Sequence, residues 1–382
     1  MDGPDLLLGG EMIAGLRRAF DNLLGQGEAA VTVPPLDGAL RPNSALDEAP
    51  SRTMLEGVDC LAVQGDALVA SAGESIFVRE ADRTWTRRAS YPSTVACLAA
   101  IGDGGLAVAL ATGEILVEGG LYHGRRYRAV GQATCITAMA AGDGTLYVAN
   151  GSATNGIAAW QRDLLERNAS GSVWQIDLET GAARQLVSGL AWPAGLAVDR
   201  TTLVVAEAWK HQLVRIDLGK INGARPQKPK VLLADLPAYP GRVAPAADGY
   251  WLALFAPRSQ LVEFVLREPA YRRRMMAEVP VPFWVAPKLR SGRSFYESLQ
   301  GGGIKHLGMV KPWAPTMSAG LCVKLDRAFQ PRFSLQSRAD GRTHGVTSAA
   351  EHGTSVFVAA RGDGVVVALP LPASGAPPGD GR

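Results

Sequence analysis

The stretch that decides the fold is GLAWPAGLAVDRTTLVVAEAW, residues 189–209. It contains two short, apolar and β-branched runs, LAV and LVVAEAW, which are separated by the polar turn DRTT. Short apolar runs bounded by turn residues are typical of buried strands. The stretch therefore predicts an entry turn, an inner strand, a tight turn and a second strand.

Versions of this unit recur along the chain, so that six copies lie roughly 35–50 residues apart outside one long insertion. A single sheet unit cannot bury both of its faces, whereas radial stacking of several units can. The sequence therefore predicts an all-β fold, a six-bladed β-propeller over residues 55–369. The other copies are VDCLAVQGDALVASA from Val58, VACLAAIGDGGLAVAL from Val95, ATCITAMAAGDGTLYVAN from Ala133, GRVAPAADGYWLALF from Gly241 and HGVTSAAEHGTSVFVAA from His344.

Residues 1–54 precede the first repeat. Apolar residues at helical spacing predict a short amphipathic helix at Glu11–Leu24. The apolar run at Ala30–Val33, stopped by two prolines, is expected to close the ring as a strand of the last blade. Residues 36–52 then read as a polar connector.

A long insertion interrupts the fifth repeat at residues 256–317. Its first part, 260–277, has helical spacing, and the rest is rich in Pro, Gly, Trp and Phe. Long apolar loops are usually functional or packed, so we expect a helical and aromatic cap over the propeller channel. The C-terminal tail, 370–382, is expected to be disordered.

The composition is that of an ordinary globular protein, with 47% hydrophobic and 20% charged residues and a net charge of +3. So small a charge argues against a nucleic-acid partner. The acidic N-terminus lacks the features of a signal peptide, and no apolar run is long enough to span a membrane. A cytoplasmic protein with a small-molecule partner is therefore expected. Weak peripheral membrane association through 11–24 and the oligomeric state are left open.

Three of the four cysteines, Cys60, Cys97 and Cys135, occupy what look like matching places in successive repeats. Buried free cysteine behaves as a small hydrophobic residue, so structural packing is the favoured interpretation. A disulfide and a reactive thiol are the alternatives.

The chain resembles the strictosidine-synthase-like six-bladed propellers, including the adipocyte plasma-membrane-associated protein group. It resembles the paraoxonases and the gluconolactonase/SMP-30 proteins more distantly. The similarity spans about Leu55 to Leu369 and implies the same propeller fold. The stretches that carry it are WQRDLLERNASGSVWQIDLETG at 160–181, LAWPAGLAVDRTTLVVAEAW at 190–209, LLADLPAYPGRVAPAADGYWLAL at 232–254 and HGVTSAAEHGTSVFVA at 344–359.

Calcium-dependent members of these families hold the metal on the channel axis with carboxylate and amide side chains. The resemblance implies that Asp59 is the one such ligand kept here, or Glu56 if the register slips. Cys135-Ile136-Thr137, Ala194 and Gly241-Arg242 stand where the family has Asn or Asp. Calcium needs about six to eight oxygens. No metal and no other cofactor are therefore expected.

Arg242 brings a fixed charge to one of the lost ligand positions. We expect its guanidinium to take the place of the calcium charge and to pair with Asp59 or with an anionic ligand, because a buried charge is costly unless it is paired. The alternative is that Arg242 points into solvent at the channel mouth.

His344 precedes the sixth inner strand and is a candidate general base, because its pKa lies near neutrality. The alternative is a turn histidine bonded to backbone. Arg242, Asp59 and His344 thus form the expected catalytic set. The expected substrate-binding side chains are Trp209, Thr347, Asn150, Trp284 and Trp313, of which Thr347 replaces the glutamate of strictosidine synthase.

The favoured function is a metal-independent enzyme, hydrolytic or bond-forming, that acts on a small organic molecule in the channel. The first alternative is a propeller without catalysis that serves as a binding or scaffold module. The second is a calcium-dependent lactonase or esterase whose ligands have moved.

Overall fold

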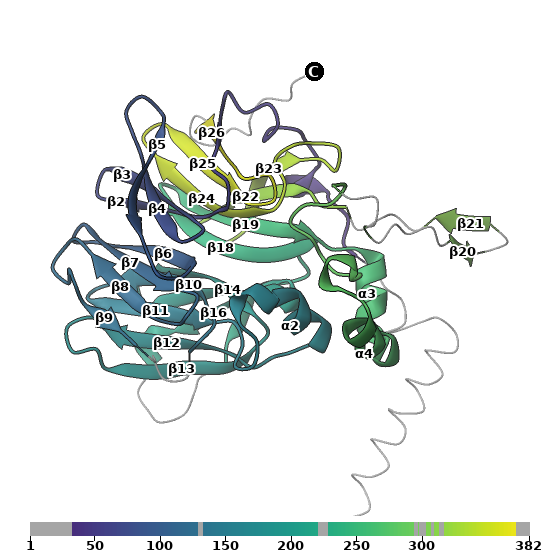
Figure 1. Cartoon of the computed structure of the whole chain (residues 1–382), viewed down its shortest axis with the longest axis horizontal. Coiled ribbons are helices and arrows are strands. Elements are labelled where there is room, and N and C mark those ends of the chain that lie inside the picture. The colour runs from purple at the N-terminus through teal and green to yellow at the C-terminus, as the bar shows by residue number, and fades with distance from the viewer. Residues whose placement is uncertain are drawn as a thin grey trace, which may run out of the picture.

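The computed structural model of the chain describes residues 33–128, 133–220, 228–293, 297, 303–306, 309–312 and 317–371. Six four-stranded antiparallel sheets form a six-bladed β-propeller, which confirms the predicted fold class (Figure 1). The first three blades contain β2 (Val58–Gln64), β3 (Ala67–Ala72), β4 (Ser75–Arg79) and β5 (Trp85–Ser90); β6 (Val95–Ile101), β7 (Gly105–Leu110), β8 (Ile115–Glu118) and β9 (Arg126–Tyr127); and β10 (Ile136–Gly142), β11 (Thr145–Asn150), β12 (Gly171–Asp177) and β13 (Ala183–Leu190). The last three contain β14 (Pro193–Asp199), β15 (Thr202–Glu207), β16 (Gln212–Asp217) and β17 (Lys230–Leu233); β18 (Ala238–Ala246), β19 (Gly249–Pro257), β22 (Gly320–Asp326) and β23 (Pro331–Ser337); and β24 (Val346–His352), β25 (Ser355–Ala360), β26 (Val365–Pro370) and β1 (Ser51–Met54).

The second strand of each blade is more buried than its outermost strand, and the sequence follows this difference. Strand β7 is GLAVAL and is buried along its whole length, because a blade lies on each of its faces. The outermost strand of the first blade, β5, is WTRRAS and is half-buried or exposed throughout. Continuous apolar runs therefore mark the inner strands, and small residues let the blades converge on the axis.

Strand β1 closes the ring, because it pairs with β26 from Ser51↔Ala368 to Met54↔Val365. This corrects the prediction that Ala30–Val33 closes it: residues 30–32 lie outside the described residues, and Val33 is in no strand. The physical reason is the length of the connection. A closing strand must lead directly into the first blade, and only residues 55–57 separate β1 from β2. The residues expected as a polar connector include Leu46, which is fully buried.

Every innermost strand carries a β-bulge at the same place, where the pairing with the second strand skips a residue. Bulges re-aim side chains and are common next to functional sites. In this propeller they bring one position of each blade to the channel axis. The bulged positions are Asp59, Ala96, Thr137, Ala194, Gly241-Arg242 and Thr347.

The bulges also correct the alignment of the cysteines. Cys60 and Cys97 directly follow the bulge in their blades, but the matching residue of the third blade is Ala138 and not Cys135. All four cysteines are buried and free, as expected for structural packing.

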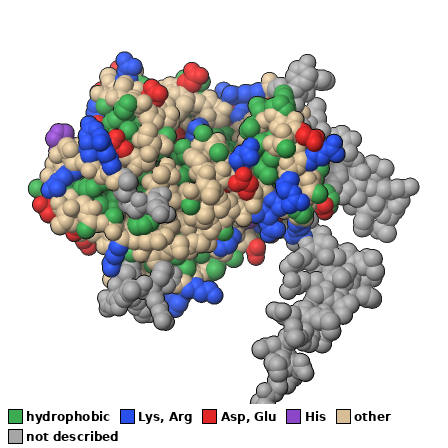
Figure 2. Space-filling view, turned by 60° about the horizontal axis from the view of Figure 1, so that its bottom comes forward, with side chains coloured by type: hydrophobic (Ala, Val, Ile, Leu, Met, Phe, Trp, Pro, Cys, Tyr) green, Lys and Arg blue, Asp and Glu red, His purple; other side chains and the backbone are tan. Residues whose placement is uncertain are grey.

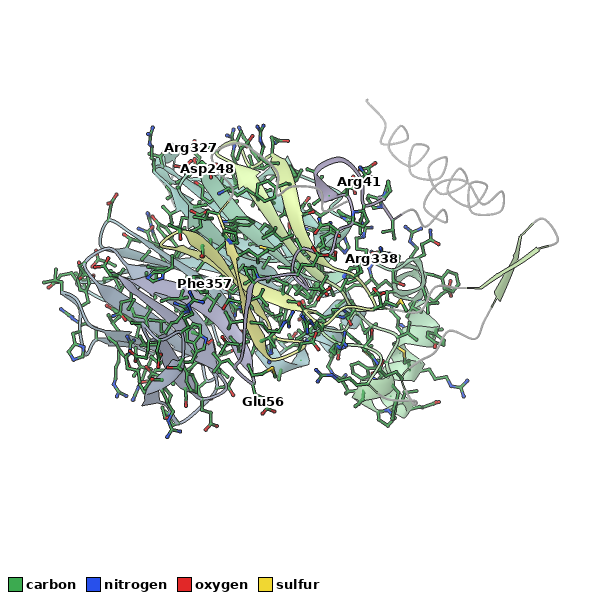
Figure 3. All side chains as sticks on the ribbon, turned by 90° about the horizontal axis from the view of Figure 1, so that it is seen from above. Arg41, Glu56, Asp248, Arg327, Arg338 and Phe357 are labelled. Carbon is green, nitrogen blue, oxygen red and sulfur yellow. The ribbon has the colours of Figure 1, made fainter. Side chains whose placement is uncertain are left out.

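The two insertions lie on one face of the propeller. Neighbouring strands of a blade run in opposite directions. Each innermost strand therefore begins at the face where the second strand ends, and we call this face the entry face. One insertion joins β11 to β12, and the other joins β19 to β22. Figure 3 shows Glu56, which precedes β2, at the opposite end of the view from Asp248 and Arg327, which lie in turns of the fifth blade.

These insertions contain the α-helices of the described chain. No helix among the described residues is long and apolar enough to cross a membrane. The predicted helix at 11–24 and residues 372–382 of the tail lie outside the described residues. The elements are η2 (Ile157–Ala159), α2 (Trp160–Glu166), α3 (Gln260–Arg267), α4 (Pro269–Glu278), η5 (Val281–Phe283), β20 (Gly303–His306) and β21 (Met309–Pro312), besides η1 (Gly38–Leu40), η3 (Ala208–Lys210) and η4 (Leu218–Lys220) elsewhere.

We predict that Gly195→Ala destabilises the ring beside the fourth bulge. An added Cβ would lie 2.1 Å from the carbonyl oxygen of Gly241 in the next blade, and that oxygen belongs to backbone. Overpacking of this kind lowers the free energy of unfolding by about 1–3 kcal/mol, measurable by urea denaturation. Gly102→Ala is the control, because its Cβ meets nothing within 4 Å, and equal effects of the two variants would contradict the prediction.

Candidate functional site

A cavity opens at the entry face over the bulged positions, and we call it the entry pocket. Its volume is about 90 Å³, and it combines a polar floor with apolar and aromatic walls. Ligand sites commonly have this character, with a few placed polar groups among apolar side chains. The lining residues are Asp59, Thr137, Ile157, Trp160, Trp192, Ala194, Gly241, Arg242, Phe255, Leu289, Thr347 and Arg361.

The floor of the entry pocket is an ion pair on the channel axis. Arg242, from the fifth blade, reaches across to the first blade, where its Nη2 lies 2.6 Å from Oδ2 of Asp59. The side chains are only 15% and 11% exposed, so the charges are largely removed from water. The structure thus contains the contact that the sequence predicted, and Arg242 does not point into solvent.

The same guanidinium also binds backbone carbonyls of three blades. Nη1 donates to the carbonyl oxygens of Asp59 and Thr347, at 3.2 and 3.3 Å, and Nη2 donates to that of Ala96 at 2.7 Å. These oxygens are available to Arg242 because innermost strands pair on one edge only. Arg242 therefore joins its own blade to the sixth, first and second blades.

A second arginine shares the carboxylate. Nη1 of Arg361, which follows β25, lies 3.2 Å from Oδ1 of Asp59, and the Arg361 side chain is 46% exposed at the pocket mouth. Burial alone would raise the pKa of Asp59, but Arg242 and Arg361 outweigh it and hold that pKa below its ordinary value. Asp59 is therefore ionised at neutral pH, and the two arginines leave the pocket with an excess of one positive charge.

The donor set of the pocket does not fit calcium. Both carboxylate oxygens of Asp59 accept guanidinium hydrogen bonds, and the bulges of the third and fourth blades present Thr137 and Ala194. Calcium needs about six to eight oxygens, several of them charged. Across the described part of the chain, no group of three or more His, Cys, Asp and Glu side chains is arranged to hold a metal ion.

The walls of the entry pocket come from an aromatic cluster. Trp160 of α2 meets Phe255 edge-on at 5.6 Å, and Trp192 stacks on Trp209 at 5.3 Å. Trp209 does not line the pocket but lies behind these walls, where its Nε1 donates to Asp163 at 2.8 Å. The structure thus places Trp209, a predicted substrate-binding residue, behind the side chains that line the pocket.

His344 lies away from both the pocket and solvent. It is fully buried; its Nδ1 accepts from Arg290 at 2.6 Å and bonds Ser318 Oγ at 2.7 Å, while its Nε2 donates to the carbonyl of Arg338 at 2.8 Å. Burial and the neighbouring Arg290 lower its pKa, so the ring is neutral at pH 7. This geometry corresponds to the backbone-bonded histidine, which sequence reasoning kept as the alternative to a general base.

The remaining predicted site residues divide between pocket and scaffold. Thr347 lines the pocket and donates from Oγ1 to the carbonyl of Asp59 at 2.6 Å. Asn150 is buried beside Cys135, from whose amide its Oδ1 accepts at 2.9 Å. Trp284 is 2% exposed in a cluster of the cap helices, and Trp313 lies outside the described residues.

Sequence reasoning missed Arg361 and did not assign Thr137 or Phe255 to the site. Thr137 is a bulged position, so aligning the six bulges would have found it. Arg361 and Phe255 lie at or near the ends of the second strands of their blades. These ends lie at the entry face, where the innermost strands begin. Among the described residues of the cap, only Leu289 lines the pocket, and the blade-three insertion supplies more of the roof.

We predict that Asp59→Asn is strongly destabilising, because it leaves Arg242 buried without a counter-ion. Removing one partner of a buried pair costs about 3–5 kcal/mol in free energy of unfolding. Glu278→Gln is the matched control, since it breaks an exposed pair with Arg274 that contributes at most about 1 kcal/mol. Denaturant melts of both variants test this, and a small loss in Asp59→Asn would show that the axial pair does not support the fold.

Comparison of the chain with known proteins supports the fold and nothing beyond it. No protein-family model and no curated protein matches the sequence. Among solved structures, a gluconolactonase from Xanthomonas campestris matches with a TM-score of 0.52 and 13% identity, over 89% of this chain and 95% of that one. Regucalcin from Agrobacterium tumefaciens, a calcium-binding protein, matches with a TM-score of 0.48 and 14% identity, over 88% and 95%. The structural neighbours are thus six-bladed propellers of the gluconolactonase and regucalcin type.

Proposed function

We propose that the chain is a metal-independent hydrolase that binds a small lactone or ester in the entry pocket. The observation that carries the proposal is the Arg242–Asp59 pair at 2.6 Å on the axis, with Arg361 on the same carboxylate. The fold of a gluconolactonase supports the reaction class by analogy only.

The two guanidiniums supply the chemistry that we propose. Hydrolysis of a lactone builds negative charge on the carbonyl oxygen, and fixed donors in a site shielded from water stabilise that charge. Arg361 is half-exposed at the mouth, where it can donate to a ligand. The Nη groups of Arg242 already have four oxygen partners, so Arg242 contributes its positive charge rather than a further hydrogen bond. The lowered pKa of Asp59 makes it a weak base. We therefore assign Asp59 the role of holding both arginines in place, and not that of a general base.

A second candidate, binding without turnover, is favoured by a specific observation. The residues that line the entry pocket in the described structure include no His, Lys or Cys, and the one carboxylate is already paired. The calcium-dependent alternative would need a cluster of metal ligands, and the described residues contain no group of three or more His, Cys, Asp and Glu side chains that could hold a metal ion. A strictosidine-synthase-like reaction has Thr347 where that family has its glutamate, so we propose no such condensation.

The test is a panel of γ- and δ-lactones and aryl esters, assayed with and without EDTA. We expect hydrolysis that EDTA leaves unchanged and that Arg242→Gln lowers by about 10² in kcat, because the fixed positive charge at the floor of the pocket is lost. Arg361→Gln, at an exposed position, is expected to fold normally and to raise KM for ligands with a carboxylate more than for neutral ones. Arg274→Gln, on the surface of α4, is the control.

Activity that EDTA abolishes and calcium restores would contradict the proposal. Quenching of Trp160 and Trp192 fluorescence by a panel member, without turnover, would establish the binding role instead.

A further inference from the structure

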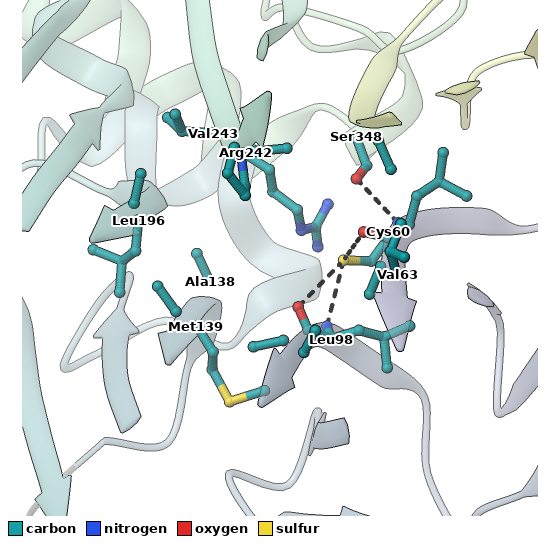
Figure 4. A pocket seen from close by; sticks show the side chains of 18 of the residues that line it. Cys60, Val63, Leu98, Ala138, Met139, Leu196, Arg242, Val243 and Ser348 are labelled. Atoms are coloured by element: carbon teal, nitrogen blue, oxygen red, sulfur yellow. Dashed lines mark hydrogen bonds between the residues drawn. The ribbon is translucent and has the colours of Figure 1, made fainter. Parts of the chain in front are cut away.

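The channel contains a second cavity on the other side of Arg242, toward the opposite face, and we call it the axial chamber. Its volume is about 280 Å³, and the six inner strands form its walls. The two charged side chains that line it are both paired, Arg242 with Asp59 at 2.6 Å and Glu351 with Lys324 at 3.0 Å. The axial chamber therefore presents no charge that calls for a ligand. Figure 4 shows the side chain of Arg242 among the wall residues Leu196, Met139, Leu98 and Cys60.

The entry pocket, by contrast, contains one charge in excess. Two arginines, Arg242 and Arg361, share the single carboxylate of Asp59. The Nη groups of Arg242 have four oxygen partners, but Arg361 has one partner within the described structure, at Oδ1 of Asp59. Because Arg361 is 46% exposed at the mouth, its remaining N–H groups are within reach of a ligand. A guanidinium binds carboxylates with two parallel hydrogen bonds, so the ligand group that fits Arg361 is a carboxylate.

Two further donors of the entry pocket have no acceptor. Nε1 of Trp160 and Nε1 of Trp192 form no hydrogen bond within the described structure, and neither atom is fully buried. The hydroxyls of Thr137 and Thr347 already donate to backbone carbonyl oxygens. The unused polar hydrogens of the lining side chains therefore belong to Arg361 and to the two indoles, and a ligand must supply the acceptors.

The walls and the size of the entry pocket suit one aromatic ring. Trp160, Trp192 and Phe255 line it, and aromatic rings pair favourably in edge-to-face and offset-stacked arrangements. The floor carbonyl oxygens that Arg242 binds already have their partner, so an apolar ring above them removes none. The volume of about 90 Å³ holds at most one six-membered ring, since a closed cavity of about 150 Å³ takes up benzene. The charged group of the ligand must then lie at the mouth, beside Arg361.

The cap, which reaches the pocket at Leu289, adds to the positive charge around it. Helices α3 and α4 together contain four arginines against two glutamates. Figure 2 shows Lys and Arg side chains gathered on the lobe that contains these helices. A positive potential raises the local concentration of anions, so the surroundings of the pocket also favour an anionic ligand.

We propose that the entry pocket selects aromatic carboxylates, with the ring against Trp160 and Trp192 and the carboxylate on Arg361. This inference deepens the proposed function and rests on it only for the place of binding, because it names the class of ligand and not the reaction. For the hydrolase, it means that the preferred lactone or ester carries a carboxylate on an aromatic ring.

The test is a titration of the full chain with 4-fluorobenzoate, in which the ¹⁹F line width of the ligand gives the dissociation constant. The comparison ligands are 4-fluorobenzamide, which has the same shape without the charge, and 4-fluorobenzylamine, which has the opposite charge beside the same ring. We expect the benzoate to bind at least about tenfold more tightly than the benzamide, because the benzamide loses a charge-assisted hydrogen bond. The benzylamine is expected not to bind.

Matched variants place the ligand. Arg361→Gln is expected to weaken binding of the benzoate about tenfold and to leave that of the benzamide unchanged. Trp160→Leu is expected to weaken binding of both ligands, because it removes part of the aromatic wall. Arg293→Gln is the control for loss of charge, since Arg293 is 62% exposed, also binds a carboxylate, that of Asp363, and does not line the pocket. Ala349→Val narrows only the axial chamber and is expected to preserve binding of both ligands.

Equal binding of the benzoate and the benzamide by the unaltered chain would overturn the proposal without recourse to any variant. An unchanged benzoate affinity in Arg361→Gln would do the same. Benzoate binding that is lost in Ala349→Val and kept in Trp160→Leu would move the ligand to the axial chamber and so contradict the proposed site.

The outcome for the hydrolase is separate. Selective binding of the benzoate, without turnover of any lactone or ester, would overturn the proposed function and leave this inference standing. Turnover of neutral lactones by a chain that does not prefer the benzoate to the benzamide would support the proposed function and overturn this inference.

Discussion

The rest of the structure depends on one guanidinium. Six inner strands meet at the axis with one backbone edge unpaired, and this leaves carbonyl oxygens around a narrow channel. Arg242 satisfies three of these oxygens and the Asp59 carboxylate with a single planar group. The planar fork of arginine can do this, whereas the ammonium of lysine, with three donors, cannot reach four acceptors in one plane. The same group divides the channel into two cavities of different chemistry.

The ion pairs and hydrogen bonds of the site hold its charged side chains in fixed positions. Asp59 holds two arginines, Thr347 supports the Asp59 backbone, and the aromatic walls rest on Trp209, which is fixed in turn by Asp163. Such a constellation suits electrostatic stabilisation of a developing charge, which requires fixed donors. It suits general-base catalysis poorly, because His344 faces elsewhere and Asp59 is kept ionised.

The fold was predictable because six repeats of one apolar pattern leave few alternatives. The pair of Arg242 and Asp59 was predictable because the family resemblance places both residues at metal-ligand positions on the channel axis. The structure adds the reason, since a bulge makes that position of each repeat face the axis. The sequence left two interpretations of His344 open, because the start of an inner strand looks the same whether a side chain faces the channel or the core. Arg361 lies in the turn RGDG, which reads as an exposed loop. The closing strand was misplaced because Ala30–Val33 is more β-branched than Ser51–Met54, and pattern alone does not show which run reaches β26.

Strand β1 has a consequence for how the protein is made. It is the first strand of the propeller to leave the ribosome, and its partner β26 is the last, more than 300 residues later. The ring therefore cannot close during synthesis, and the growing chain holds five blades and an open edge until its final segment emerges. Closing so long a loop costs conformational entropy and makes folding slow, so the nascent chain is exposed to aggregation until β26 is complete.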